Sequence, residues 1–342
     1  MYTIGYIKKL VTKYNIILAA VFISGFALGF FEPLFNLKKI TTVQNISPFR
    51  EKENNYAFIN PLLFYDVPKV NDSSEYSGLV YRIGRIVSDF TNENSERKAS
   101  FYYRDLSHGQ WVGINEDESY TPSSLLKVVV MIAYFKEAES RPNIFSHTIL
   151  FSKDIDKTIG TISYDRGTNL KLNQRYTVSE LIDKMIIDSD NGATYTLLSE
   201  IEDESLKQIY IDLNLEDPEN AGRTYTISTK EYIRFLRILY NATFLSRDMS
   251  ERALSLLSQT NFQDGIAASV PRSIKVAHKY GETVSVKDAN TIDFIELHDC
   301  GIIYYPNKPY LLCIMTRGDN IDDLSSVIKL ISETVYKYVN LK

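Results

Sequence analysis

The sequence predicts an α/β (α+β) fold, in which an antiparallel β-sheet is combined with many helices. Apolar residues recur with helical spacing in two long segments, at 76–92 and 322–339. Other segments have the composition of β-strands, at 273–279, 291–297, 300–305 and 310–315. The last two flank a turn at 306–309, so we expect them to form an antiparallel hairpin.

Each remaining element follows from its own pattern. The apolar stripes of the two long helices are Leu79, Ile83, Ile86, Val87 and Phe90, and Leu324, Val327, Ile328, Ile331 and Val335. An apolar run at 125–133 predicts a buried helix, and the periodic segment 178–186 precedes another helix at 193–201. A strand pair is expected at 99–106 and 110–115.

The stretch Thr-Pro-Ser-Ser-Leu-Leu-Lys at 121–127 is the most informative in the chain. Pro122 favours the first turn of a helix, and Thr121 suits the cap of its unpaired amides. Residues three apart share a helical face, so we expect the amine of Lys127 to lie within reach of the Ser124 hydroxyl.

This spacing suits nucleophilic catalysis. A serine hydroxyl is a poor nucleophile until a base removes its proton, and a lysine is such a base only when burial or nearby positive charge lowers its pKa. A helix start supplies positive potential and leaves the Ser124 amide available for an oxyanion. Because Ser-x-x-Lys is common on surface helices, this pair alone does not indicate a catalytic site, and further motifs are needed.

Two more motifs follow. Ser189-Asp190-Asn191 lies between two predicted helices, where an ordinary turn is the alternative interpretation. His278-Lys279-Tyr280-Gly281 opens the strand-rich region, where an edge strand with a solvated lysine is the alternative. The order S-x-x-K, S-D-N and K-T-G is the signature of class A β-lactamases and penicillin-binding proteins.

The chain resembles this superfamily over residues 76–342 and is nearest to the class A β-lactamase catalytic domain. The resemblance implies that the N- and C-terminal helices of the domain pack together on one face of the sheet. It also implies a separate all-helical lobe that contains the serine helix, with the active site between the lobe and the sheet.

The resemblance assigns four catalytic residues. Ser124 resembles the acylated nucleophile, and Lys127 resembles its base. Ser189 resembles the hydroxyl that relays a proton to the leaving nitrogen. Lys279 resembles the cation that steadies this serine and attracts the substrate carboxylate.

It also assigns substrate-binding positions. Asn191 resembles the residue that contacts the side-chain amide of the substrate. The amides of Ser124 and Glu282 resemble the oxyanion pair, and Gly281 would let the strand approach closely.

The chain departs from the family pattern at Tyr280, where a Thr or Ser is usual. The small hydroxyl at this position contacts the substrate carboxylate, whereas the phenol lies further out on a rigid ring. We expect Tyr280 to line the substrate site, with carboxylate recognition weakened or left to Lys279 and another donor.

The larger departure lies in the loop between the second and third motifs. Class A enzymes carry E-x-x-L-N there, and its glutamate activates the water that releases the acyl group. The segment 213–223 has no such motif. Glu216 and Glu219 are candidates for a relocated base, although solvated loop carboxylates are the simpler interpretation.

The function follows from what is present and what is missing. The sequence predicts a membrane-anchored serine hydrolase that is acylated at Ser124 by a β-lactam and hydrolyses it slowly. One alternative is a D-alanyl-D-alanine carboxypeptidase or transpeptidase acting on peptidoglycan stem peptides. Another is a penicillin-binding sensor without turnover, and an inactive scaffold ranks last.

Composition limits the partners. The 342 residues are 44% hydrophobic and 24% charged, as in an ordinary globular protein. A net charge of −5 offers no basic surface for nucleic acid. No cofactor is expected, because the chain contains no phosphate-binding glycine loop.

An uncharged, apolar run of 18 residues at Tyr14–Phe31 is close to the minimum for spanning a bilayer. Preceding lysines favour a cytoplasmic N-terminus, and a signal peptide is less favoured because no small-x-small site follows the run. The predicted single-pass membrane protein has a short cytoplasmic N-terminus at 1–14, an anchor at 15–33, an extracytoplasmic linker at 34–75 and an extracytoplasmic catalytic domain at 76–342.

Cys300 and Cys313 lie on the two arms of the predicted hairpin. A turn at 306–309 would place Ile302 opposite Cys313, so buried thiols are favoured over a disulfide.

No two of the four histidines have metal-ligand spacing, so no metal site is expected. His278 adjoins Lys279 and is a candidate for tuning that lysine, and His298 is a candidate for bracing its strand.

Overall fold

The computed structural model describes residues 49–50, 56–64, 74–94, 96–152, 168–221, 225–288 and 291–341. The predicted N-terminus and anchor at 1–33, and most of the linker at 34–75, lie outside these ranges. Among the described residues, no helix has the length and apolar character needed to cross a membrane.

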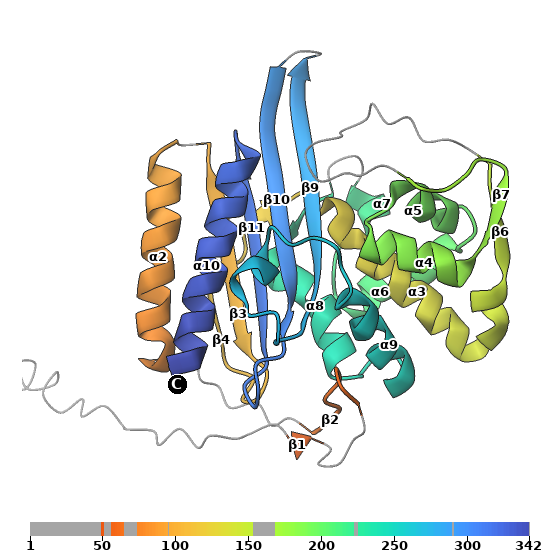
Figure 1. The fold of residues 1–342 in the computed structure, drawn as a ribbon, viewed down its shortest axis with the longest axis horizontal. Helices are drawn as coiled ribbons and strands as arrows, with labels where there is room; N and C mark the ends of the chain where they lie inside the picture. Colours follow the sequence, from red (N-terminus) through yellow and green to blue (C-terminus); the bar gives the residue numbers. More distant parts are fainter. Residues whose placement is uncertain are drawn as a thin grey trace, which may run out of the picture. The chain divides into compact units, whose positions relative to one another are not determined.

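The centre of the fold is a five-stranded antiparallel sheet with the order β4-β3-β11-β10-β9 (Figure 1). Its strands are β3 (Lys98–Asp105), β4 (Trp111–Ile114), β9 (Val276–Asp288), β10 (Thr291–Ile303) and β11 (Tyr310–Gly318). Side chains alternate across it, so that Ile302 of β10 faces one hydrophobic core while its neighbour Ile303 faces the other.

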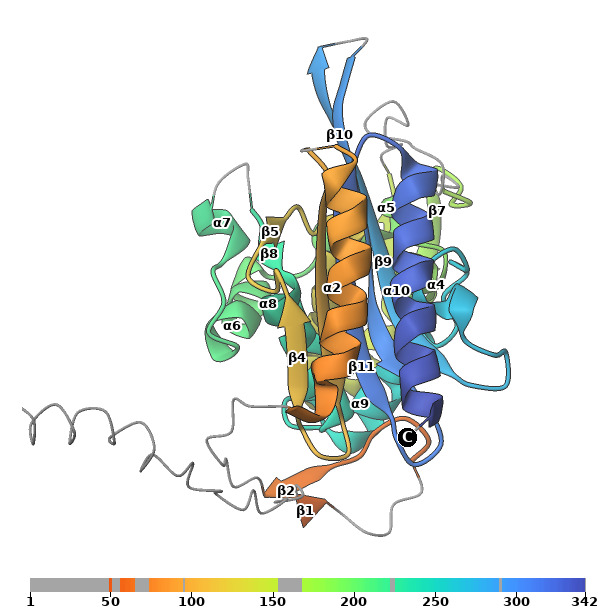
Figure 2. The same cartoon turned by 90° about the vertical axis from the view of Figure 1, so that its left-hand side faces the viewer.

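Two long helices cover one face of the sheet, as predicted. Helix α2 (Ser77–Asn92) and helix α10 (Ile321–Leu341) lie side by side there (Figure 2). The buried residues of α2 are Leu79, Ile83, Val87 and Phe90, four of the five in its predicted stripe. All five stripe residues of α10 are buried.

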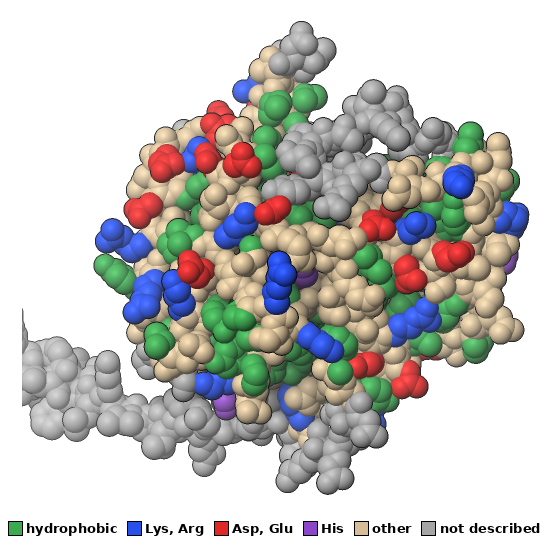
Figure 3. Space-filling view, in the orientation of Figure 1, with side chains coloured by type: hydrophobic (Ala, Val, Ile, Leu, Met, Phe, Trp, Pro, Cys, Tyr) green, Lys and Arg blue, Asp and Glu red, His purple; other side chains and the backbone are tan. Residues whose placement is uncertain are grey.

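The opposite face carries the helical lobe, which the resemblance also predicted. Its helices are α3 (Lys127–Ser140), α4 (Val178–Ile187), α5 (Asn191–Leu198), α6 (Asp203–Asp212), α7 (Pro218–Ala221), α8 (Thr229–Tyr240) and α9 (Arg247–Leu257). Short strand pairs join β5 (Ser119–Tyr120) to β8 (Ile227–Ser228), and β6 (Thr148–Phe151) to β7 (Gln174–Thr177). On the molecular face in Figure 3, acidic and basic side chains are interspersed.

The strand prediction was wrong in two places. Strand β10 runs without a break through His298 and Asp299, where two separate strands were expected, because both side chains are buried and hydrogen-bonded. Strand β9 continues to Asp288 instead of ending at Lys279. Its end, residues 285–288, pairs with β10 beyond the last residue of β11, so its sequence lacks the apolar pattern of a buried strand (Figure 1).

The cysteine prediction was also wrong. Ile303 pairs with Tyr310, so the connecting loop spans 304–309 and is longer than the expected turn. This shifts the register and places Cys300 directly opposite Cys313, with a Cα–Cα distance of 4.0 Å. The two form a disulfide that is buried in the sheet.

Part of the predicted linker packs on the catalytic domain. Phe58 and Ile59 are buried in the core on the lobe side of the sheet, and the Phe58 ring meets Tyr304 edge to face. The carboxylate of Glu251, on α9, accepts hydrogen bonds from the backbone amides of residues 57, 58 and 59 at 2.7–3.1 Å. One side chain therefore satisfies three backbone amides of this segment. The same segment includes the short strand β2 (Leu62–Phe64), which pairs with β1 (Phe49–Arg50).

We expect Glu251→Gln to lower the free energy of unfolding by about 1–3 kcal/mol, because the new amide NH₂ faces backbone donors it cannot accept from. Urea denaturation measures the change. Glu333→Gln is the control: its exposed ion pair with Lys337 contributes at most about 0.5 kcal/mol. Equal effects in both variants would contradict a specific role for Glu251.

Candidate active site

The serine segment begins with a tight turn instead of the predicted regular helix. Ser124 lies in the 3₁₀ turn Ser123–Leu126, and α3 starts only at Lys127. Ser123 has φ 50°, a left-handed conformation that costs free energy in a residue other than glycine. Its hydroxyl donates to the Glu282 carbonyl of β9 at 2.5 Å, which ties the turn to the sheet.

Thr121 does not cap the helix through its side chain; its backbone is instead held by β10. Its N–H donates to Glu296 Oε2 at 3.0 Å, and its carbonyl accepts from His298 Nε2 at 3.1 Å. Glu296 Oε1 accepts from Arg317 Nε at 2.8 Å and from Nη2 at 2.6 Å. Glu296 and His298 are both 0% exposed, so this clamp is shielded from water.

The clamp fixes the protonation state of His298. Its Nδ1 accepts from the Thr316 amide at 3.3 Å while Nε2 donates to the Thr121 carbonyl, so the ring must be neutral. Burial lowers the pKa of His298 below its ordinary value of 6.5, against the opposing effect of Glu296.

Stability should therefore depend on pH. In the unfolded chain His298 gains a proton near pH 6.5, whereas the folded state resists protonation until lower pH. We expect the free energy of unfolding to fall below pH 6.5, by at most about 1.4 kcal/mol per pH unit from this group. Urea denaturation at pH 7 and 5.5 tests this, and His298→Gln should flatten the slope. An unchanged slope in that variant would contradict the assignment.

Gly281 of β9 packs directly against the serine turn. A Cβ built on Gly281 would lie 2.7 Å from the Pro122 carbonyl oxygen and 3.1 Å from the Leu125 side chain. The contact with the backbone oxygen is too short for any Cβ, so glycine lets β9 reach the serine segment without a shift of the backbone.

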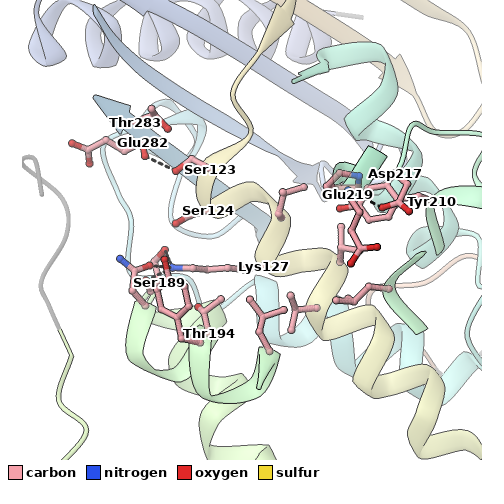
Figure 4. Close-up of a pocket in the computed structure, with 18 of the residues that line it drawn as sticks. Ser123, Ser124, Lys127, Ser189, Thr194, Tyr210, Asp217, Glu219, Glu282 and Thr283 are labelled. Carbon is pink, nitrogen blue, oxygen red and sulfur yellow. Dashed lines mark hydrogen bonds between the residues drawn. The ribbon is translucent and has the colours of Figure 1, made fainter. Parts of the chain in front are cut away.

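Lys127 points into the site and its side chain is almost fully buried. Its amine donates to the Ser189 carbonyl, to Ser189 Oγ at 3.1 Å and to Asn191 Oδ1 at 2.7 Å. The first and second motifs are therefore joined through this lysine, and Ser124 lies one turn before it on the same wall of the pocket (Figure 4).

Lys279, on β9, reaches the same serine. Its amine donates to Ser189 Oγ at 2.9 Å and to the Tyr280 carbonyl at 3.1 Å. Burial lowers the pKa of Lys279 well below its ordinary value, and the nearby charge of Lys127 lowers it further. One hydroxyl thus lies between two amines, a geometry suited to proton relay.

The second motif combines a left-handed backbone conformation at Ser189 with a helix cap at Asp190. Ser189 has φ 59°, in the left-handed region, and Asp190 caps α5 through a 2.8 Å bond from the Ala193 amide to its Oδ1. This places Ser189 and Asn191 on the pocket while Asp190 is buried beneath them.

His278, the candidate for tuning Lys279, is buried against Asp299, with Nδ1 2.8 Å from Oδ1. Asp299 Oδ2 also accepts from the Ile266 amide at 2.8 Å. Asp299 raises the pKa of Lys279, in opposition to the larger effect of burial. His278 therefore contacts Asp299 and is not itself among the described residues that line the pocket.

These residues surround a pocket of about 530 Å³. Six of the predicted site residues line it from the three motifs or the position after them: Ser124, Lys127, Ser189, Asn191, Tyr280 and Glu282. Lys279 and Gly281 contact this set from behind. Among the described residues, no cluster of His, Cys, Asp or Glu has the arrangement of a metal site.

The far wall contains residues that the sequence did not single out. Asp217 and Tyr210 line the pocket there, with Glu219 but without Glu216, which is exposed (Figure 4). Asp217 Oδ1 accepts from the Glu219 amide at 3.1 Å, whereas its buried Oδ2 has no hydrogen-bond partner. Asp217-Pro218 directly before α7 is a sequence signal for a helix cap, which marks Asp217 as an ordered residue.

The comparison with known families is consistent with this geometry. Residues 82–339 match the family model of Beta-lactamase2, the Beta-lactamase enzyme family. The chain belongs to this family. The match spans the three motifs, the sheet and most of both terminal helices of the domain, as the sequence resemblance implied.

Solved structures share the fold of this β-lactamase family member. A mutant of PBP-A, as an acyl-enzyme complex with penicillin G, has 22% identity and a TM-score of 0.63, covering 78% of this chain and 97% of its own. A class A β-lactamase from Mycobacterium abscessus has 18% identity and a TM-score of 0.62, covering 77% and 99%. A β-lactamase from Sphaerobacter thermophilus has 16% identity and a TM-score of 0.64, covering 77% and 98%.

Proposed function

We propose that this protein is a membrane-anchored serine hydrolase that is acylated at Ser124 by β-lactams and releases the acyl group slowly. The observation that supports it is the position of Ser189 Oγ, within hydrogen-bonding distance of the amines of both Lys127 and Lys279. Such an arrangement can accept the proton of Ser124 and pass one to the leaving nitrogen.

The proposed acylation needs Lys127 as a neutral amine, so one of its three ammonium protons first leaves to solvent. The Ser124 oxygen then attacks the carbonyl carbon while its proton moves to this amine. The C–N bond then breaks, and the nitrogen takes a proton from Ser189, which Lys127 or Lys279 replaces. The amides of Ser124 and Glu282 stabilise the oxyanion that forms between these steps.

Slow release follows from the loop between the second and third motifs. Its carboxylates at the pocket are Asp217, which is buried, and Glu219, which is exposed. Neither has the E-x-x-L-N context of the family's water-activating glutamate. A peptidase that transfers stem peptides, or a penicillin-binding sensor, shares the same acylation step and differs in how long the acyl-enzyme persists.

We also propose that the catalytic domain is extracytoplasmic and anchored by residues 15–33. The disulfide between Cys300 and Cys313 supports this, because disulfides persist in oxidising compartments and are rare in the cytosol. Fractionation of cells expressing the full chain, with protease added to intact spheroplasts, tests the location. A domain that stays protected would contradict it.

The decisive experiment follows a fluorescent penicillin on the purified full chain in detergent. We expect labelling that is abolished in Ser124→Ala and persists after excess label is removed. Rapid loss of label would indicate a fast β-lactamase instead. A Ser124→Ala variant that still labels would refute Ser124 as the nucleophile.

A further inference from the structure

The lysine of the third motif, Lys279, is fully buried. The Lys279 side chain is 0% exposed, and the described residues that line the pocket include Tyr280 but not Lys279. Its amine is engaged by Ser189 Oγ and by the Tyr280 carbonyl, and it lies 4.3 Å from the centroid of the Tyr280 ring. A carboxylate in the pocket therefore meets the tyrosine before it meets the lysine.

The Tyr280 ring is fixed in this position. It is 7% exposed and stacks on Phe262, with 4.1 Å between ring centroids and 20° between ring planes. A stack of this kind adds to the hydrophobic burial of both rings, so the ring does not swing aside at little cost. A threonine or serine at position 280 would leave this volume open.

The charges around the pocket also disfavour a carboxylate. Its described lining carries two amines, Lys127 and Lys207, and four carboxylates, Asp203, Asp217, Glu219 and Glu282. Glu282 lies two residues from Tyr280 on the same strand. A negative wall in a cleft repels a substrate anion more strongly than it would in open water.

We propose that Tyr280 removes the preference of this site for acyl donors whose leaving group carries a free carboxylate, so that internal amides and esters acylate Ser124 as readily. This inference rests on the proposed acylation of Ser124. It widens the substrate class of the site beyond C-terminal peptides: a neutral chain that continues past the scissile bond would pass the tyrosine wall without an unpaired charge.

The test compares penicillin G with its methyl ester. The second-order rate constant for acylation of the full chain is measured by intact-protein mass spectrometry, and each value is normalised to the alkaline hydrolysis rate of the compound. We expect the acid and the ester to react within about threefold of each other. A site that reads the carboxylate through a charged hydrogen bond would favour the acid by about tenfold or more, which would overturn the inference.

Two substitutions identify the responsible group. Tyr280→Thr should uncover Lys279 and raise the acid-to-ester ratio by about tenfold, as a charge-assisted hydrogen bond becomes available. Tyr280→Phe keeps the ring and should keep the wild-type ratio. A fall in that ratio would mean that the phenol binds the carboxylate, and a folded Tyr280→Thr with no change would mean that the ring is not the barrier; either result refutes the role of Tyr280.

The same data separate this inference from the proposed function. A strong preference for the acid would refute the inference while leaving acylation of Ser124 intact. Failure of both compounds to acylate the wild-type protein would refute both. Thermal unfolding of the two variants shows whether each still folds when the stack with Phe262 is changed. If a variant does not fold, the acid-to-ester ratio of the wild-type protein still tests the inference.

Discussion

Lys127→Ala should slow acylation by the fluorescent penicillin by about 10²–10⁴-fold, the usual contribution of a positioned general base. The substitution removes the amine that bonds Ser189 Oγ and Asn191 Oδ1, and with it the base expected for Ser124. The fold should survive, because alanine suits a helix and the neighbouring Val128 and Val129 keep their packing. The observed rate constant at saturating label measures the effect.

Two further variants sharpen this result. Lys127→Arg keeps a positive charge but cannot give up its proton, so it should remain as slow as alanine if the lysine acts as a base. Substantial rescue by arginine would show that the charge alone matters. Lys136→Ala is the matched control on the same helix, because its exposed amine pairs with Glu139 on the surface. Normal labelling of Lys127→Ala would refute the proposed mechanism.

The sequence predicted most of the architecture because its signals are local. Amphipathic spacing gives α2 and α10 within one or two residues of their observed bounds, and the motif order gives the family. Composition also located β3 and β4 closely. The sequence predicts these helices and strands because the pattern of buried residues in each one appears in its own stretch of sequence.

Predictions failed where structure depends on long-range contacts. The end of β9, residues 285–288, lies beyond the last residue of β11 and pairs with β10 alone, so these residues show no burial pattern. The disulfide depended on a register that the length of one loop decides. The pocket wall at Asp217 depends on the path of the loop across the lobe, and the capping signal at Asp217 indicates a helix start but not this path.

The clamp on the serine turn is a second example, since no sequence pattern connects Thr121 with Glu296 on a strand far along the chain. The same residues explain why Ser124 stands in a 3₁₀ turn instead of a capped helix. Thr121 binds β10 through its own backbone amide and carbonyl and does not cap the turn with its side chain, and Gly281 leaves room for the turn to rest on β9.

Glu296→Gln should therefore have the second large effect. Both carboxylate oxygens of Glu296 act as hydrogen-bond acceptors: Oε1 accepts from Arg317 and Oε2 accepts from the Thr121 amide. A glutamine supplies one oxygen and one NH₂, so one of these donors must face another donor in a site that is 0% exposed. We expect the free energy of unfolding to fall by about 2–4 kcal/mol.

Acylation should also slow in Glu296→Gln, by roughly tenfold in protein that remains folded, because the turn that positions Ser124 loses one of its two anchors on β10. Urea denaturation and the labelling rate constant measure the two effects separately. Glu118→Gln is the matched control, since Glu118 pairs with Lys98 at the surface and should change stability by less than about 1 kcal/mol. If Glu296→Gln lost stability but acylated at the wild-type rate, the clamp would be a support of the fold and not of the nucleophile, because the serine turn would then keep its geometry through β9 alone.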